Sequence, residues 1–335
     1  MKVFLNVYGV NFQLQGNAEQ AIEHLCDDFR FFVSTDTPKP DVVVNIVEQE
    51  PPYDSVPQSA ASAYTPRNIC ITEEDVTYLD YSTKALGVWE RSKNTFTLYS
   101  EHFDYQYEAV YLFLISRIGE LLDAKRLHRI HAMAISFNGK SVLAILPMGG
   151  GKSTLCNGLL RVPDFNFLSD DSPLIDREGK ILAYPLRLGL LPGNEVGIPE
   201  KHIRRINRME FGPKVLLNYE YFAHKVVPSS DPGIVFIGER SLAKGCRIEK
   251  IGWLDQHKSI VADCVVGLGL YQGLEFVLRT NVFELFAKAG TAISRFRNAR
   301  RLFRNSEVYR LVLGRDTDAN VTAVAAFVRE KLGPR

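Results

Sequence analysis

One short stretch limits the possible folds of this chain more than any other. Residues 142–146 are apolar, three glycines follow at 149–151, and a Lys-Ser-Thr run at 152–154 leads into a second, mostly apolar segment at 155–160. This order predicts a strand, a glycine-rich loop and a helix. It is the arrangement of a phosphate-binding loop, in which backbone N–H groups and a helix N-terminus bind a polyphosphate.

The residue types in this stretch suit a polyphosphate. Glycines allow backbone N–H groups to converge on oxygen atoms. Lys152 offers a charge to the β- and γ-phosphates, Ser153 is expected to bind Mg²⁺, and Thr154 adds a hydroxyl. Leu146 stands where the usual pattern begins with glycine, and the competing interpretation is a tight turn without a ligand. The predicted nucleotide-binding residues are Gly149, Gly150, Gly151, Lys152, Ser153 and Thr154.

A pair of carboxylates follows the next predicted strand. Residues 164–168 form a core-strand pattern, and Asp170 and Asp171 follow it, 18 and 19 residues after Lys152. Ligands of parallel sheets bind at the carboxyl ends of strands, so we expect both aspartates near the glycines. One can bind Mg²⁺ while the other takes the proton from an attacking hydroxyl. The alternative is a simple turn with an aspartate cap.

His131 is a third candidate. It lies 21 residues before Lys152, in a predicted strand at 128–137 that the Asn138-Gly139 turn joins to the strand entering the glycines. A lone histidine in a strand is more often structural. Further metal or substrate groups are conceivable at Glu195, Glu200, Asp231 and Glu239.

Two groups of arginines allow two interpretations each. Arg204, Arg205 and Arg208 are either surface residues or cations that close over phosphates. The other group lies in a predicted C-terminal helix, and it forms either a solvated basic face or an anion-binding surface. Its members are Arg295, Arg297, Arg300, Arg301 and Arg304.

Composition excludes several classes of protein. The net charge of +1 gives no support for a nucleic-acid or membrane-surface partner, and no run of about 18 apolar residues predicts a membrane span. Five scattered cysteines without Cys-x-x-Cys spacing argue against a disulfide framework or a zinc site. Because the first residues also lack the apolar core of a signal peptide, we expect a cytoplasmic protein.

Patterns of apolar residues predict an α/β protein in two parts. Residues 1–104 form a β-rich α+β unit, and residues 105–335 form the domain of the glycine loop with a helical C-terminal extension. Predicted helices cover 17–33, with Asn17 as N-cap, and 105–127, 152–161, 254–265, 281–296 and 318–331. Predicted strands cover 41–48, 69–71, 76–81, 85–89, 95–99, 128–137, 141–146, 164–168, 234–237 and 309–313.

Three motifs together resemble a known family. His131, the run Gly149–Thr154 and the run Leu168–Asp171 are similar to the catalytic domain of HPr kinase/phosphorylase and its relatives. Phosphoenolpyruvate carboxykinase has a more distant version of this nucleotide site. The resemblance covers residues 125–190. It implies an α/β catalytic domain of that type, and an ATP-dependent kinase that phosphorylates a serine-type hydroxyl.

The resemblance also implies a role for each residue. Lys152 and the glycines would bind the phosphates, Ser153 and Asp171 the magnesium, Asp170 would be the base, and His131 would be a neighbour of the phosphates. The Glu-x-Arg-Gly stretch of the HPr enzymes is missing, and residues 184–189 are the nearest segment. The chain therefore looks more like the divergent HPr-kinase-related group, some of whose members phosphorylate peptides.

These observations lead to three hypotheses. The first is an ATP- and Mg²⁺-dependent phosphotransferase acting on a hydroxyl of a protein, peptide or small molecule. The second is a nucleotide-sensing module without catalysis, and the third is a structural protein with an inactive loop. A homo-oligomer is compatible with each of them.

Overall fold

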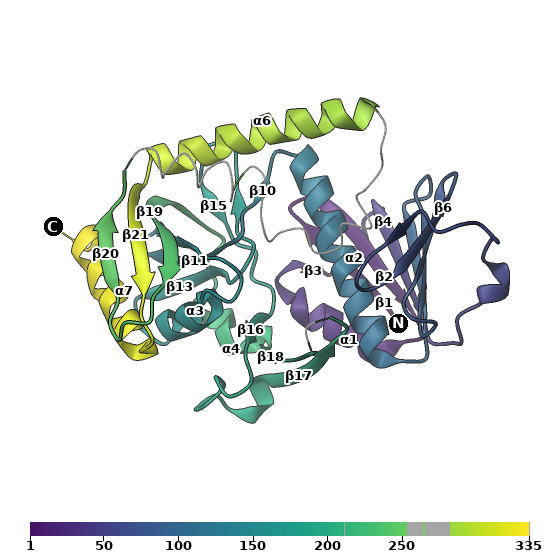
Figure 1. The fold of residues 1–335 in the computed structure, drawn as a ribbon, viewed down its shortest axis with the longest axis horizontal. Helices are drawn as coiled ribbons and strands as arrows, with labels where there is room; N and C mark the ends of the chain where they lie inside the picture. The colour runs from purple at the N-terminus through teal and green to yellow at the C-terminus, as the bar shows by residue number, and fades with distance from the viewer. Residues whose placement is uncertain (211, 253–263, 265–281, 335) are drawn as a thin grey trace. The chain divides into compact units, whose positions relative to one another are not determined.

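A computed structural model describes residues 1–210, 212–252, 264 and 282–334, with the side chains of 282–288 left out (Figure 1). The described chain is a mixed α/β structure, which confirms the predicted class at that level. It packs as two units. The first holds residues 1–121 and 204–216, and the second holds 122–203 together with the described residues from 217 onward.

The first unit is built on one mixed sheet, and it confirms the predicted strands between residues 41 and 99. In spatial order the strands are β3 (Val33–Ser34), β1 (Lys2–Val7), β2 (Val10–Gly16), β4 (Val42–Val47), β9 (Thr95–Tyr99), β8 (Leu86–Glu90), β7 (Val76–Asp80), β6 (Ile69–Glu73) and β5 (Ala63–Tyr64). The remaining elements are α1 (Glu19–Asp28), η1 (Arg30–Phe32), η2 (Tyr53–Ser55), α2 (Phe103–Ala124) and the neighbouring strands β17 (Ile203–Arg208) and β18 (Gly212–Leu217).

Helix α1 differs from the prediction at both ends. Its N-cap is Ala18, not Asn17, because the Asn17 side chain accepts a hydrogen bond from the Glu48 backbone N–H at 2.8 Å. It ends at Asp28, where a 3-10 turn and β3 follow, so the predicted helix at 17–33 was too long. In both places a contact with the sheet replaces a local helix signal.

Helix α2 packs with the first unit along most of its length. Phe113 of α2 stacks on Phe96 of β9 with ring centroids 4.1 Å apart, and both rings are fully buried. Residues 105–121 of α2 therefore belong to the first packing unit. The predicted boundary between residues 104 and 105 concerned folding domains, and it stays a prediction.

The second unit is built on another sheet. Its strands run in the order β10 (His128–Arg129), β14 (Leu174–Ile175), β15 (Ile181–Leu182), β19 (Ser229–Arg240), β12 (Lys140–Ile145), β11 (Ala132–Phe137) and β13 (Phe165–Ser169), with β21 (Glu307–Leu313) on β19 and β20 (Arg247–Lys250) on β21. Shorter elements are β16 (Leu188–Leu190), η3 (Glu200–His202), α4 (Tyr219–Phe222) and η4 (Ala223–Lys225).

Strand directions bring several strand ends to one edge of this sheet. β12 is parallel to β19, and β19 is parallel to β21. β11 is antiparallel to both β12 and β13, so β13 runs in the direction of β12. The predicted turn at Asn138-Gly139 is confirmed, with φ of 50° and 74°, the positive values of a type I′ hairpin. The carboxyl ends of β12, β13, β19 and β21 therefore meet at the same edge.

The predicted strand at 128–137 was wrong in one respect, because it is two strands. β10 pairs with β14, whereas β11 pairs with β12 and β13. Between them the Ala132 N–H donates to the Ile130 carbonyl at 3.0 Å, which closes a three-residue turn around His131. His131 thus lies at the entrance of β11, outside the ladder.

Helices cover the second sheet. α3 (Lys152–Leu160) lies beside α7 (Thr317–Leu332), and a β-carbon at Gly158 would collide with Val321 of α7. Phe327 of α7 packs on Tyr309 of β21 with ring centroids 4.7 Å apart. The long helix α6 (Val282–Arg304) extends beyond the predicted 281–296 and is labelled in Figure 1. The predicted helix at 254–265 lies outside the described residues apart from residue 264.

No helix in the described residues is long and apolar enough to cross a membrane. All five cysteines are free thiols.

Candidate functional site

Residues 147–151, here called the glycine loop, connect β12 to α3. Gly149 and Gly151 have φ of 72° and 97°, a left-handed conformation that other residues rarely adopt. A β-carbon at Gly150 would lie only 2.8 Å from the Pro147 carbonyl oxygen. Gly151 is the N-cap of α3 and no side chain caps the helix, so the first N–H groups of α3 are available to an anion.

Lys152 is a buried charge that is held by the loop and by His131. Its side-chain Nζ donates to the carbonyl oxygens of Leu146 at 2.7 Å and Pro147 at 3.2 Å. It also lies 2.8 Å from His131 Nε2. Because an ammonium group only donates, His131 Nε2 must accept, and the imidazole proton is on Nδ1.

His131 connects Lys152 to Asp171. Its Nδ1 lies 3.1 Å from Asp171 Oδ1, although the atoms are not aligned for a hydrogen bond. The imidazole is buried, whereas the Asp171 side chain is 51% exposed. The turn at Ile130–Ala132 therefore places the His131 imidazole between a buried lysine and a carboxylate that faces solvent.

Ser153 and Asp170 form a second contact beside the first. The Ser153 hydroxyl donates to Asp170 Oδ2 at 2.8 Å, and Asp170 is 7% exposed. A hydroxyl and one carboxylate, completed by phosphates and water, are a usual protein contribution to a Mg²⁺ site. Three or more His, Cys, Asp or Glu side chains grouped to hold a metal do not occur among the described residues. The residues present fit a magnesium ion that is shared with a bound phosphate.

The contacts bring together the residues that the sequence singled out at positions 131, 152, 153, 170 and 171. Thr154 is half-buried in the first turn of α3. No protein-family model matches the chain, and no curated protein matches it.

Leu146 has a clear place in the structure. It leaves β12 with its side chain 2% exposed, packed where Gly238 of β19 lacks a side chain. A β-carbon at Gly238 would collide with the Leu146 side chain. The large residue at the start of the loop is thus accommodated by a glycine on the neighbouring strand, while its carbonyl oxygen binds Lys152.

Arg240 is a candidate that the sequence analysis missed. It is the last residue of β19, it is exposed, and its Nη1 lies 2.9 Å from the position of a β-carbon at Gly151. The predicted strand at 234–237 stopped before this arginine. Only the parallel pairing of β19 with β12 shows that the end of β19 reaches the glycine loop. A second cation therefore stands beside the predicted phosphate position.

Cys156 lies in α3, four residues after Lys152, and is fully buried. Burial, and then the Asp170 charge, raise the pKa of its thiol well above the usual value. The thiol therefore stays protonated at neutral pH, which argues for a packing role and against a nucleophilic one.

Several lesser candidates have other partners. Asp231 lies at the opposite end of β19 from Arg240, 3.8 Å from both Lys140 and Lys180. Arg204 pairs with Asp28 and donates to the Tyr107 hydroxyl at 2.9 Å. These contacts give both residues structural roles within their own units.

Three further candidates also make local contacts. The Gly193 N–H donates to Glu195 at 2.6 Å, Glu239 lies 3.8 Å from Arg310, and the Arg208 Nε donates to the Gly212 carbonyl at 3.2 Å. Glu200 begins the 3-10 helix η3. These contacts do not connect them with His131, Lys152 or the aspartates.

Proposed function

We propose that this chain is an ATP- and Mg²⁺-dependent phosphotransferase that transfers the γ-phosphoryl group to a hydroxyl of a protein, peptide or small molecule. The observation that carries the proposal is the pair of contacts Lys152–His131 and Ser153–Asp170 beside a helix N-terminus that no side chain caps. The resemblance to HPr-kinase-related enzymes and the likeness to the phosphoenolpyruvate carboxykinase nucleotide site support the same reaction. We expect such an enzyme in the cytoplasm, where ATP is available.

Phosphate binding would use groups that are already in place. The first backbone N–H groups of α3 have no side-chain cap and can bind an anion, and the Lys152 side chain is held by the Leu146 and Pro147 carbonyls. Arg240 adds an exposed guanidinium beside Gly151. Fixed positive groups that face the developing charge stabilise a phosphoryl-transfer transition state without reorganisation.

The contacts favour different roles for the two aspartates. A magnesium ion, when bound, would neutralise phosphate charge. Asp170, which accepts from Ser153, is the better partner for it. Asp171 is half exposed, so it is the better base for an incoming hydroxyl. This is the reverse of the assignment that the family resemblance implies, in which Asp170 is the base and Asp171 binds the metal.

The test compares two lysine variants. Lys152→Ala removes the cation at the glycine loop. Lys140→Ala removes a half-exposed lysine at the first residue of β12, the end of that strand that lies away from the glycine loop. ATP binding is measured by calorimetry with Mg²⁺, and ADP release is measured in the presence of candidate acceptors. We expect Lys152→Ala to weaken ATP binding at least about 10-fold and to abolish ADP release, and Lys140→Ala to behave as the wild type.

The outcomes separate the competing functions. Unchanged ATP affinity and turnover in Lys152→Ala would overturn the proposal. ATP binding without consumption by any acceptor, and without an effect of Asp170→Asn, would instead identify a nucleotide-sensing module. Absence of ATP binding to the wild-type chain would leave the glycine loop with a structural role.

A further inference from the structure

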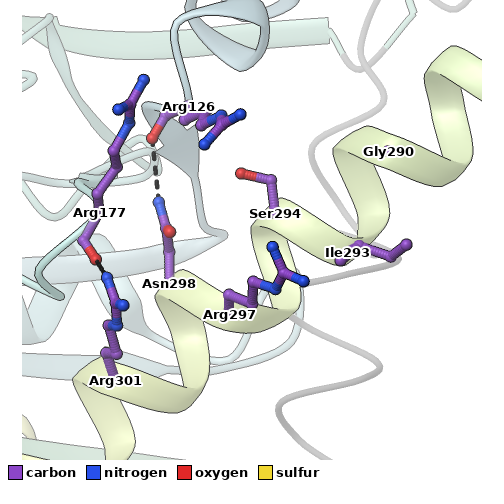
Figure 2. Close-up of a pocket in the computed structure, with 8 residues that line it drawn as sticks. All are labelled: Arg126, Arg177, Gly290, Ile293, Ser294, Arg297, Asn298 and Arg301. Carbon is purple, nitrogen blue, oxygen red and sulfur yellow. Dashed lines mark hydrogen bonds between the residues drawn. The ribbon is translucent and has the colours of Figure 1, made fainter.

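A basic cavity lies on the second unit, on residues that the proposed function does not use. Its volume is about 190 Å³, and its walls come from the connection between α2 and β10, the turn between β14 and β15, and α6 (Figure 2). The lining residues are Arg126, Arg177, Gly290, Ile293, Ser294, Arg297, Asn298 and Arg301. Four arginines from three distant segments therefore meet around one small space.

The charge of this cavity is not balanced by the described protein. Arg126, Arg177, Arg297 and Arg301 form no ion pair with any described carboxylate, and all four are exposed. Other arginines of the same unit do pair, as Arg329 does with Asp164 at 3.0 Å. Because the whole chain has a net charge of only +1, the excess of positive charge is local. Like charges gathered in this way repel one another, and an anion relieves the repulsion.

The walls of the cavity are fixed by hydrogen bonds and close packing. The buried Asn298 side chain donates to the Arg126 carbonyl at 3.0 Å, and the Arg301 guanidinium donates to the Arg177 carbonyl, as the dashed lines of Figure 2 show. A β-carbon at Gly179 would lie 2.7 Å from the Leu302 backbone nitrogen. The turn that carries Arg177 thus sits directly on the helix that carries Arg297.

Asp123, which reaches the cavity wall through His128 and Ser294, is already engaged in two contacts. Asp123 Oδ1 lies 2.8 Å from His128 Nδ1, and Arg295 donates to Asp123 Oδ2 at 2.7 Å. Burial opposes ionisation of Asp123, but the contacts with His128 and Arg295 outweigh it and lower the pKa of the carboxyl. His128 Nε2 in turn lies 2.8 Å from the hydroxyl of Ser294, which lines the cavity. Asp123 therefore holds Ser294 in place through His128, and its charge is paired with that of Arg295.

We propose that this cavity binds the phosphate group of a small phosphate monoester. Guanidinium groups present paired donors that match phosphate oxygens, and several of them from different directions suit a compact dianion better than a single carboxylate. A second hollow of about 460 Å³, lined by Glu178, Arg301, Arg304 and Asn305, adjoins at Arg301 and leaves room for the rest of the molecule. The site is independent of the glycine loop, with which it shares no residue.

The experiment counts phosphate sites on the full-length chain. Equilibrium dialysis with radiolabelled inorganic phosphate, at constant ionic strength, compares the wild type with the double variant Arg177→Gln/Arg297→Gln. Neither of these guanidinium groups makes a hydrogen bond with the described residues, so their replacement leaves the walls intact. The matched control is Arg247→Gln/Arg300→Gln, which removes the same charge from exposed positions outside the cavity.

We expect the double variant to bind one phosphate fewer than the wild type, with affinity at the lost site reduced at least about 10-fold, and the control to keep the full number. A count that falls by one in the double variant, from two to one or from one to zero, supports the cavity as a phosphate site. An equal count in the double variant and the wild type would overturn the proposal.

Methyl phosphate then distinguishes a monoester from free phosphate. We expect unlabelled methyl phosphate to displace labelled phosphate from the site that the double variant loses. Failure to displace it would overturn the assignment of a monoester ligand.

Discussion

Lys152 shows how a single residue links this fold to its proposed chemistry. A buried ammonium group is unfavourable unless its donors are used, and Lys152, at 7% exposure, directs its donors to the Leu146 and Pro147 carbonyls and to His131. The contact with His131 is the one that a bound phosphate can replace most readily, because the two carbonyls belong to the backbone at Leu146 and Pro147, where the chain enters the loop. The lysine is thus positioned before any ligand arrives.

The two neighbouring aspartates differ in what they contact, and this leads to a prediction about their roles. We expect Asp170→Asn to raise the Mg²⁺ concentration needed for half-maximal activity by about 10-fold, because the amide beside Ser153 lacks the negative charge that would hold the metal ion. We expect Asp171→Asn to leave the Mg²⁺ requirement unchanged and to lower the turnover rate by about 10²- to 10⁴-fold, as expected for loss of a general base. Steady-state kinetics across a magnesium titration measures both quantities.

Each variant serves as the control for the other, since both replace a carboxylate by an amide at adjacent positions. A changed Mg²⁺ requirement in Asp171→Asn, with Asp170→Asn affecting only the turnover rate, would restore the assignment implied by the family resemblance.

Among the elements, the geometry of the segment that runs from β12 through the glycine loop to α3 depends on the neighbouring strand β19. Leu146 fills the space that Gly238 leaves open, so the loop begins from a packed position. The same pairing of β12 with β19 brings Arg240 to Gly151. The geometry of the loop is therefore a property of two parallel strands, and not of the loop residues alone.

Gly238→Ala tests this dependence. The added methyl group collides with Leu146, so we expect the variant to lose about 1–3 kcal/mol of unfolding free energy through overpacking. In a Leu146→Ala background the collision with the side chain is gone and only a tight contact with the Ile145 carbonyl oxygen at 3.1 Å remains, so we expect Gly238→Ala to destabilise much less there. Urea unfolding of the wild type, the two single variants and the double variant gives the coupling energy. Equal destabilisation in both backgrounds would show that Leu146 and Gly238 do not interact as described.

Across the whole chain, the proposed nucleotide site belongs to one of the two packing units. His131, Lys152, Asp170 and Arg240 all lie in the second unit, as do the arginines of the basic cavity. The first unit contributes no residue to these contacts among the described residues. Binding of a nucleotide should therefore act on the second unit directly.

Hydrogen exchange measured by mass spectrometry tests this expectation. A ligand that binds only the folded state stabilises it by about 2.7 kcal/mol at 100 times its dissociation constant. With ATP and Mg²⁺ we expect slower exchange in peptides that cover 131–171 and 234–240, and unchanged exchange in peptides that cover 1–99. The same experiment with AMP and Mg²⁺ is the control, because AMP lacks the β- and γ-phosphates. Protection confined to the first unit, or no protection at all, would contradict the proposed site.

Local signals were enough to predict a large part of this structure. The Asn138-Gly139 turn, the glycines at 149–151 and the strand before Asp170 were recognised because each depends on backbone preferences within a few residues. Asn17 failed as an N-cap because a strand backbone at Glu48 competed for its side chain. The strand at 128–137 appeared continuous because its apolar pattern does not reveal that β10 and β11 pair with different partners.

The amino-acid sequence alone determined the order strand, glycine loop and helix, since the conformations of these residues follow from glycine, hairpin and helix preferences. Only the tertiary structure decided which groups meet there. Arg240 reaches Gly151 because β19 pairs with β12, and Arg126, Arg177 and Arg297 converge because α6 packs on the β14–β15 turn. These partners are separated by long stretches of chain, and contacts between strands and helices leave no local pattern from which such a meeting can be predicted.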